Sequence, residues 1–246
     1  MHTVKKGGCF LGKAAQTVFK RTEKKYLVSV EQFGRLRSAF LPYMEPDEYG
    51  EYTICNVYFD TENDDLIRRS LEKPVFKEKL RVRSYGVPAA DDKVFLEMKR
   101  KFKGVVYKRR VAMRYDELQT YLQTGAHRET EKNKQIFAEL GYFLDFYHPV
   151  PKVWIAYDRI AFRGRDAPTL RITFDRNIRY RYDDLTLGAE DRGTFLLPAG
   201  QYVMEIKADG AMPLWLCDLL DRERLFPTSF SKYGNIYKRN LQKEVF

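Results

Sequence analysis

Four cationic side chains alternate along residues 77–86, which read KEKLRVRSYG. Successive side chains of a β-strand point to opposite faces, so one face of a strand here would carry Lys77, Lys79, Arg81 and Arg83. Cations held so close repel one another unless water or an anion offsets their charge. Arginine offers paired donors to phosphate oxygens and lysine a point charge, so phosphate is the anion that suits this pattern best.

A charged face opposite an apolar face recurs in five other segments. Their charged or polar positions are Arg21, Glu23 and Lys25; Glu97 and Lys99; Tyr157 and Arg159; Arg171, Thr173 and Asp175; and Glu205 and Lys207. An ordinary sheet with its charged face in water would explain any one of these strands. All six carry Arg or Lys, however, and this favours an antiparallel eight-stranded β-barrel with a polar, basic lumen that holds a polyanion.

Eight strands and four helices are predicted around these segments. Alternation and turn residues predict strands over residues 20–28, 53–58, 79–85, 94–100, 105–113, 153–162, 169–175 and 202–207. Helical spacing predicts helices near 29–42, 115–122, 129–144 and 212–226, the first with a capping box formed by Ser29 and Gln32. We therefore expect an α+β fold in one domain over residues 20–246, with its helices packed outside the barrel. Residues 61–73 have mixed charge and are interpreted as solvated surface.

The composition points to polyanionic partners and a reducing compartment. The 246-residue chain has 44 Lys and Arg against 34 Asp and Glu, a net charge of +10. Three thiols without framework spacing (Cys9, Cys55 and Cys217) suit the cytoplasm, and no apolar run approaches the roughly 18 residues of a membrane span. Residues 1–19 are interpreted as a flexible leader and not a signal peptide. The sequence has no GxxxxGK[ST] loop, CxxC pair or HExxH motif, which argues against P-loop kinases and common zinc enzymes.

A few carboxylates share the predicted basic faces and would repel phosphate unless a divalent cation lay between them. Glu23, Glu97 and Glu205 are therefore candidate contacts for Mg²⁺ or Mn²⁺, which take oxygen ligands and bridge phosphates. A salt bridge to a neighbouring Arg or Lys explains each of these glutamates equally well.

An ordered set of short motifs runs through the chain: RTEKKYLVS, YFDT, KLRVRSYG, FLEMKRK, YDRIAF, LRITFD, YVMEIK and FSKY. Together they resemble the catalytic domain of the vacuolar transporter chaperone (VTC) family, the polyphosphate polymerases, over roughly residues 20–240. That family belongs to the triphosphate tunnel metalloenzymes, whose members enclose a basic tunnel in a β-barrel. The related CYTH triphosphatases typically open with Glu-x-Glu-x-Lys, where this chain has Arg21, Glu23 and Lys25. Loss of one carboxylate favours binding a longer polyanion over hydrolysis of a triphosphate.

The resemblance implies a set of site residues. The predicted catalytic residues, which would hold and align phosphates, are Lys25, Arg81, Arg83, Lys99, Arg159, Arg171 and Lys232. It also implies substrate contacts at Tyr157 and Ser231 and a metal contact at Glu205. Independently of the resemblance, the charged strands add Glu23, Lys108 and Lys207 as predicted substrate contacts and Glu97 as a predicted metal contact. The implied reaction is a metal-dependent transfer of the γ-phosphate of ATP to a growing polyphosphate chain, with release of ADP.

Three other functions remain open. A triphosphate or polyphosphate hydrolase would use the same lumen with water as the acceptor. A polyphosphate-binding module would lack turnover and metal dependence, and a nucleic-acid-binding module would need stacking aromatics on an exposed basic face. We do not expect the last, because the sequence shows no helix-turn-helix, zinc or RNP signature. The inositol-phosphate-sensing domain and membrane helices of larger VTC proteins do not appear in this sequence, so we expect a free-standing polymerase, with a membrane-anchoring partner left open.

Overall fold

The computed structural model of the protein describes residues 21–244. Residues 1–20, which include the predicted leader and Cys9, lie outside the described range, as do residues 245–246 and the side chains of Arg21, Lys243 and Glu244. Cys55 and Cys217 are both free thiols, in agreement with the interpretation of the sequence.

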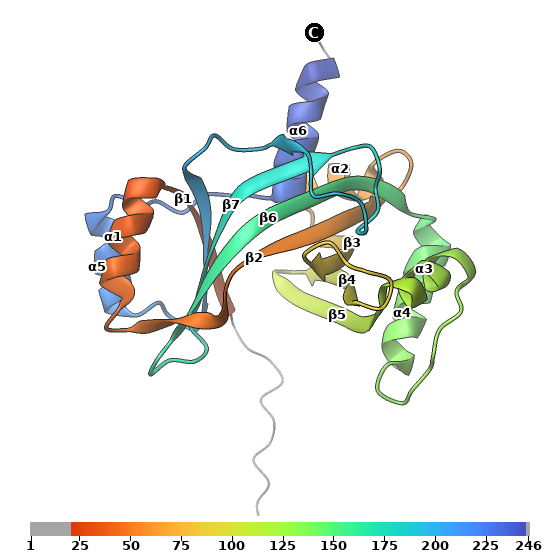
Figure 1. The fold of residues 1–246 in the computed structure, drawn as a ribbon, viewed down its shortest axis with the longest axis horizontal. Coiled ribbons are helices and arrows are strands. Elements are labelled where there is room, and N and C mark those ends of the chain that lie inside the picture. The colour runs from red at the N-terminus through yellow and green to blue at the C-terminus, as the bar shows by residue number, and fades with distance from the viewer. Residues whose placement is uncertain (1–20, 245–246) are drawn as a thin grey trace, which may run out of the picture.

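The described strands form one antiparallel sheet (Figure 1). They are β1 (Arg21–Ser29), β2 (Met44–Asp60), β3 (Phe76–Tyr85), β4 (Lys93–Phe102), β5 (Val105–Arg114), β6 (Val150–Gly164), β7 (Arg171–Arg181), β8 (Thr194–Phe195) and β9 (Gln201–Asp209). Their order is β1-β9-β7-β6-β2-β3-β4-β5, with the short β8 beside β7. No pairing joins β1 to β5 within residues 21–244, so the antiparallel α+β fold is confirmed but the predicted closed barrel is not.

Six helices accompany the sheet in the described part of the chain. They are α1 (Val30–Phe40), α2 (Asp65–Leu71), α3 (Tyr115–Thr124), α4 (Lys134–Tyr147), α5 (Leu214–Arg222) and α6 (Lys232–Glu244). The four predicted helices correspond to α1, α3, α4 and α5, and the predicted capping box at Ser29 and Gln32 begins α1. None of these helices is long and apolar enough to cross a membrane.

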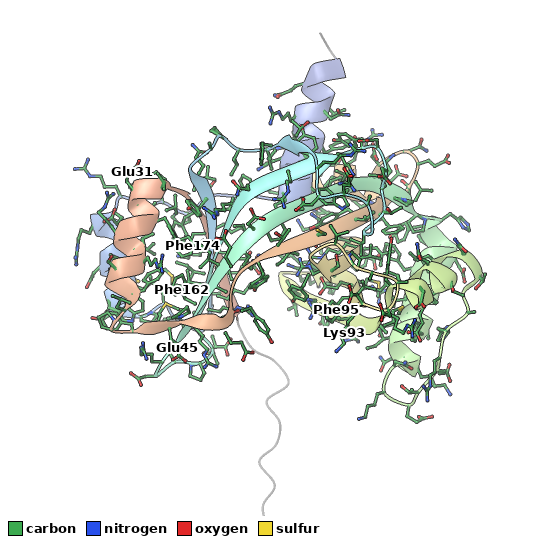
Figure 2. The ribbon with its side chains drawn as sticks, viewed as in Figure 1. Glu31, Glu45, Lys93, Phe95, Phe162 and Phe174 are labelled. Atoms are coloured by element: carbon green, nitrogen blue, oxygen red, sulfur yellow. The ribbon has the colours of Figure 1, made fainter. Side chains whose placement is uncertain are left out.

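Two apolar clusters lie between the sheet and the four predicted helices. Under α1 and α5, Phe33 packs edge-on against Phe174 at 4.9 Å and Phe40 against Phe162 at 5.6 Å, measured between ring centroids. Figure 2 shows Phe162 and Phe174 on the side of the sheet that α1 covers. A second cluster, which includes Leu118 of α3, lies under α3 and α4 at the other end of the molecule. The apolar faces of the six alternating strands are thus covered by helices, as their alternation predicts.

The short helix α2 and the C-terminal helix α6 pack on the opposite face of the sheet, so the prediction that all helices lie outside is wrong for these two. Their apolar cluster contains Ile67 of α2, Tyr233 and Ile236 of α6, and Tyr58 of β2. The carboxylate of Asp60 accepts hydrogen bonds from the backbone N–H groups at the start of α2 and from the Tyr233 hydroxyl at 3.1 Å. Residues 61–73 are therefore not all solvated surface as interpreted: one side of α2, with Leu66 and Ile67, is buried.

Candidate active site

The strand register brings the predicted phosphate-binding residues onto one face of the sheet. Arg81 lies opposite Glu97, Lys99 opposite Lys108, and Lys25 opposite Glu205. We call this surface the basic face. It carries the charged positions of the six alternating segments, and α6 covers part of it. The alternation in the sequence therefore predicts the shared face correctly, even though the sheet does not close.

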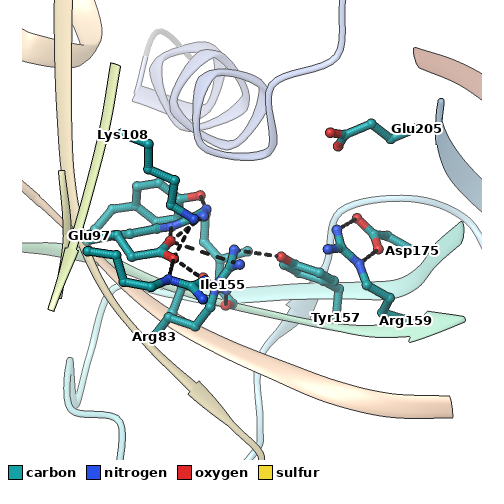
Figure 3. A network of polar contacts seen from close by, with 12 residues as sticks. Arg83, Glu97, Lys108, Ile155, Tyr157, Arg159, Asp175 and Glu205 are labelled. Carbon is teal, nitrogen blue, oxygen red and sulfur yellow. Dashed lines mark hydrogen bonds and ion pairs between the residues drawn. The ribbon is translucent and has the colours of Figure 1, made fainter. Parts of the chain in front are cut away.

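A buried carboxylate on β4, Glu97, organises the cations on β3 and β5 (Figure 3). Glu97 is 3% exposed, and its two oxygens accept from Arg81 at 2.7 and 2.8 Å, from Arg110 at 2.6 Å and from Lys108 at 2.7 Å. Burial raises the pKa of Glu97, but the charges of Arg81 and Arg83 outweigh it and hold the pKa well below its usual range. Glu97 therefore stays ionised and keeps the cations in fixed positions.

Arg83 connects this cluster to the centre of the basic face. Its guanidinium is buried, donates to Asn56 Oδ1 at 2.9 Å and to the Tyr157 hydroxyl at 3.1 Å, and lies 4.0 Å from Glu97. The Asn56 amide in turn donates to the Ile155 carbonyl oxygen at 3.0 Å. A guanidinium held on three sides is preorganised, so it can meet an anion without first rearranging.

A second carboxylate organises the other side of Tyr157, as Figure 3 shows. Asp175 is fully buried and accepts from Arg159 at 2.6 and 2.9 Å and from Lys232 of α6. The Lys232 ammonium also lies 4.1 Å from the centroid of the Tyr157 ring, where a cation–π contact is favourable. Burial raises the pKa of Asp175, but Lys232 and Arg159 lower it further than burial raises it.

Two lysines of the sheet, Lys25 and Lys79, contact the residues at the start of α6. Lys25 donates to the Phe230 carbonyl oxygen at 3.0 Å, and Lys79 lies 3.5 Å from the Ser231 hydroxyl. Ser231 caps the helix by accepting from the Gly234 N–H at 3.2 Å. The N-terminal end of a helix carries partial positive charge, so it adds to the cations of this face.

Glu205 is the carboxylate on this face that best suits a divalent cation. It forms an ion pair with Lys207 through one oxygen, and Glu23 on the neighbouring strand lies 3.8 Å from Lys25. Burial raises the pKa of Glu205, but Lys207 and Lys25 lower it to about 2, so the group is anionic at neutral pH. Mg²⁺ is commonly bound by one or two carboxylates together with substrate phosphates, which matches this arrangement.

Glu97 fits a metal less well, because Arg and Lys side chains contact both of its oxygens. A salt bridge describes these contacts, and a metal role for Glu97 stays a prediction that they do not favour. Among the described residues, no three His, Cys, Asp or Glu side chains gather in a way that could hold an ion by themselves. A metal at Glu205 would therefore share its ligands with a bound phosphate.

Lysines continue the basic face beyond the arginines. Among the side chains that the structure describes, no carboxylate oxygen lies within 4.0 Å of the side-chain nitrogens of Lys77, Lys79, Lys99 and Lys101. Lys77 lies opposite Lys101 and Lys79 opposite Lys99, so like charges face one another across β3 and β4. Directly opposed like charges destabilise a sheet, and a bound polyanion would relieve this cost.

The basic face should bind phosphates less well above about pH 8. Burial, with the charges of Lys77 and Lys99, lowers the pKa of Lys79 to about 8. Burial raises the pKa of Tyr58, but Arg81 and Arg83 lower it to about 8. As pH rises through this value Lys79 loses its positive charge and Tyr58 becomes anionic, so both changes remove net positive charge. We expect the affinity for inorganic tripolyphosphate, measured by calorimetry, to fall roughly tenfold between about pH 7 and about pH 9.

The matched variant is Lys79→Arg, which keeps its charge throughout this range. Its affinity should fall less than that of the unmodified protein over the same interval. If the affinities of the two proteins for tripolyphosphate fell equally with pH, loss of the Lys79 charge would not explain the weaker binding.

The remaining predicted residues lie at the borders of the basic face. Arg171 is half exposed and contacts Asp47 at 3.3 Å, and Lys99 is exposed. Lys207 is bound to Glu205. Sequence reasoning did not assign site roles to several residues that the structure places among the clusters: Asn56, Tyr58, Arg110 and Asp175. Their alternation within β2, β5 and β7 could have indicated the shared face, but not which of them would contact the arginines.

Comparison with known proteins agrees with this arrangement. The VTC domain family matches residues 20–240. The chain is 23% identical over 286 residues to vacuolar transporter chaperone complex subunit 4 of Trypanosoma cruzi, an alignment that covers 96% of this chain and 36% of that protein. The chain thus spans about a third of the length of that relative.

Among solved structures, the likeness in fold comes with low sequence identity and rests on one protein. One from Bacillus halodurans, described as a candidate adenylate cyclase, superposes with a TM-score of 0.51 at 16% identity, covering 85% of this chain and 92% of that one. The Hippeastrum protein HpAC1, described as having a dominant triphosphatase activity, gives 0.48 at 18% identity over 86% and 92% of the two chains. Since the family match extends over most of its length, the chain belongs to the VTC domain family.

Proposed function

We propose that the protein is a polyphosphate polymerase, which transfers the γ-phosphate of ATP to the end of an inorganic polyphosphate chain and releases ADP. The family to which the chain belongs and its Trypanosoma cruzi relative support this function. The structural observation that carries it is the row of lysines on β3 and β4 that continues from Arg81 and Arg83 without carboxylate partners. Such a row extends the anion site beyond the arginines and suits a long polyanion.

Phosphoryl transfer requires alignment of the reacting oxygens and neutralisation of charge on the transferred group. Arg83 and Arg159 are fixed by Asn56 and Asp175, respectively, and Lys232 lies beside Arg159 at the start of α6. These side chains would hold the phosphates of donor and acceptor in line. A divalent cation bound by Glu205 and the substrate would neutralise further charge on the phosphates.

A phosphate oxygen is the acceptor that best suits this face. The four carboxylates among the strand cations of the basic face (Glu23, Glu97, Asp175 and Glu205) each have a Lys or Arg nitrogen within 4.0 Å. A carboxylate neutralised in this way is a poor base for activating water, whereas a terminal phosphate is already anionic near neutral pH. This favours chain growth over hydrolysis by the same site.

The test is to incubate the purified protein with ATP and Mn²⁺ or Mg²⁺ and to separate the products by size. We expect a polymer that an exopolyphosphatase digests, together with ADP. Orthophosphate and ADP without polymer would identify a hydrolase. Binding of added polyphosphate without any release of ADP would identify a binding module.

A further inference from the structure

A row of aromatic side chains borders the arginines on the basic face. Tyr52 of β2 contacts Tyr85 of β3 at 5.7 Å, and Tyr85 contacts Phe95 of β4 at 5.8 Å, both edge to face between ring centroids. Tyr49 extends the row beyond Tyr52 at 6.1 Å. The Arg110 guanidinium lies 4.4 Å from the centroid of Phe95 and joins the row to the Glu97 cluster.

This row is not simply part of the core. Tyr85 is 52% exposed and Tyr49 is 69% exposed, whereas Tyr52 and Phe95 are half-buried. The rings therefore support one another while leaving aromatic surface open to solvent. Aromatic surface of this kind, next to cations, is suited to stacking a planar base.

The order of side chains along β3 matches the order of groups in a nucleotide. From Tyr85 the same face continues through Arg83, Arg81, Lys79 and Lys77. Residues two apart on a strand are separated by about 6.6 Å, so the aromatic ring lies one such step from the first arginine. Tyr52 likewise lies opposite Arg159 in the register of β2 and β6. In both places an aromatic ring lies next to an arginine, so a ligand with an aromatic group at one end and phosphates at the other would match them.

We infer that the row of Tyr52, Tyr85 and Phe95 is the binding site of the nucleobase of the phosphate donor. This inference rests on the proposed function, because it takes a nucleotide as the donor. It also orients the substrates: the base lies at the Tyr85 end of β3, the triphosphate lies along Arg83 and Arg81, and the polyphosphate chain extends toward Lys79 and Lys77. Stacking is tolerant of the base, so discrimination between purine nucleotides should be weak.

The test compares ATP with inorganic tripolyphosphate, which lacks the base, as ligands of the full chain in calorimetry. Tyr85→Leu should weaken ATP binding about tenfold and leave tripolyphosphate binding unchanged. Tyr85→Phe keeps the ring and should bind both ligands as the unmodified protein does. Tyr142→Leu is the matched control, because Tyr142 is likewise an exposed tyrosine but lies on α4, away from the basic face.

Equal losses for ATP and tripolyphosphate, or no loss for either, would overturn the inference. So would an unmodified protein that binds ATP no more tightly than tripolyphosphate. Because Tyr85 is half exposed, the Leu variant should fold, and an unchanged far-UV circular dichroism spectrum would verify this. The binding assay does not require turnover, so a protein that makes no polyphosphate would refute the proposed function without deciding this inference.

Discussion

Replacement of Arg83 by alanine is expected to lower the rate of polyphosphate synthesis at least about a hundredfold, the usual cost of losing one preorganised donor to a transferred group. Arg83 is buried at the centre of the basic face, with its guanidinium oriented by Asn56 and Tyr157. Its neighbours Arg81 and Arg110 are not free to take its place, because both are bound to Glu97. The measurement is the initial rate of polymer formation at saturating ATP and metal.

The alanine variant should also be less stable by about 1–3 kcal/mol, since the Asn56 and Tyr157 oxygens lose a buried donor. Rates should therefore be compared at a temperature where both proteins are folded. Arg109→Ala is the control, because Arg109 lies on the opposite face of β5 and binds Glu139 of α4. Lys25→Ala should lose synthesis as well. Folded Arg83→Ala and Lys25→Ala proteins that both make polyphosphate at nearly normal rates would refute the assignment of the basic face.

Replacement of Glu97 by glutamine is expected to lower the free energy of unfolding by about 3 kcal/mol, the low end of the usual cost of breaking a buried ion pair, because water partly solvates the cations left behind. The carboxylate is the shared partner of Arg81, Lys108 and Arg110, and an amide cannot neutralise them. Urea unfolding near neutral pH measures this loss. The control is Glu139→Gln on α4: the Glu139 side chain is 21% exposed, against 3% for Glu97, so its loss should be smaller.

The acid side of the stability curve gives an independent check on Glu97. Its folded pKa is lowered, so its contribution to stability is complete above the unfolded value of about 4.3 and is lost as pH falls below it. The unmodified protein should therefore lose stability more steeply than Glu97→Gln as pH falls below about 4. If Glu97 were instead mainly a metal contact, the variant would need more Mn²⁺ but would unfold at nearly the same urea concentration.

Strand faces were predictable from the sequence because side-chain direction alternates at every residue. The same rule placed Arg81, Glu97, Arg159 and Glu205 on one face of the folded sheet. Closure of the sheet was not predictable from it. Whether β1 meets β5 depends on the twist and stagger accumulated over all the strands between them, which no single segment records.

The two helices that sequence reasoning missed, α2 and α6, are stabilised by tertiary contacts more than by local pattern. Helix α2 has only seven residues and depends on Asp60, which precedes it by five positions. Helix α6 has Gly234 in its first turn, which lowers its helical propensity. A Cβ atom at Gly234 would lie 3.1 Å from the Leu71 side chain, so the glycine permits close packing of α6 on α2.

The sequence likewise does not show which charged side chains form ion pairs with one another. Alternation placed Glu97 and Asp175 on the basic face, but strand register decided that Arg81 and Arg110 meet Glu97 while Arg159 meets Asp175. The contact of Lys232 with Asp175 joins positions 57 residues apart and exists only because α6 returns to the sheet. Only the contacts in the folded protein distinguish Glu97 and Asp175, which hold cations in place, from the metal candidate Glu205.

Transfer of the γ-phosphate of ATP to a polyphosphate chain, and not to water, is the step that defines the proposed reaction. It is tested most directly by incubating the protein with γ-labelled ATP and Mn²⁺ or Mg²⁺ and measuring how the label divides between long polymer and free orthophosphate. We predict that most of the label appears in polymer that an exopolyphosphatase digests, with one ADP formed for each phosphate incorporated. Label found only in orthophosphate would contradict the account.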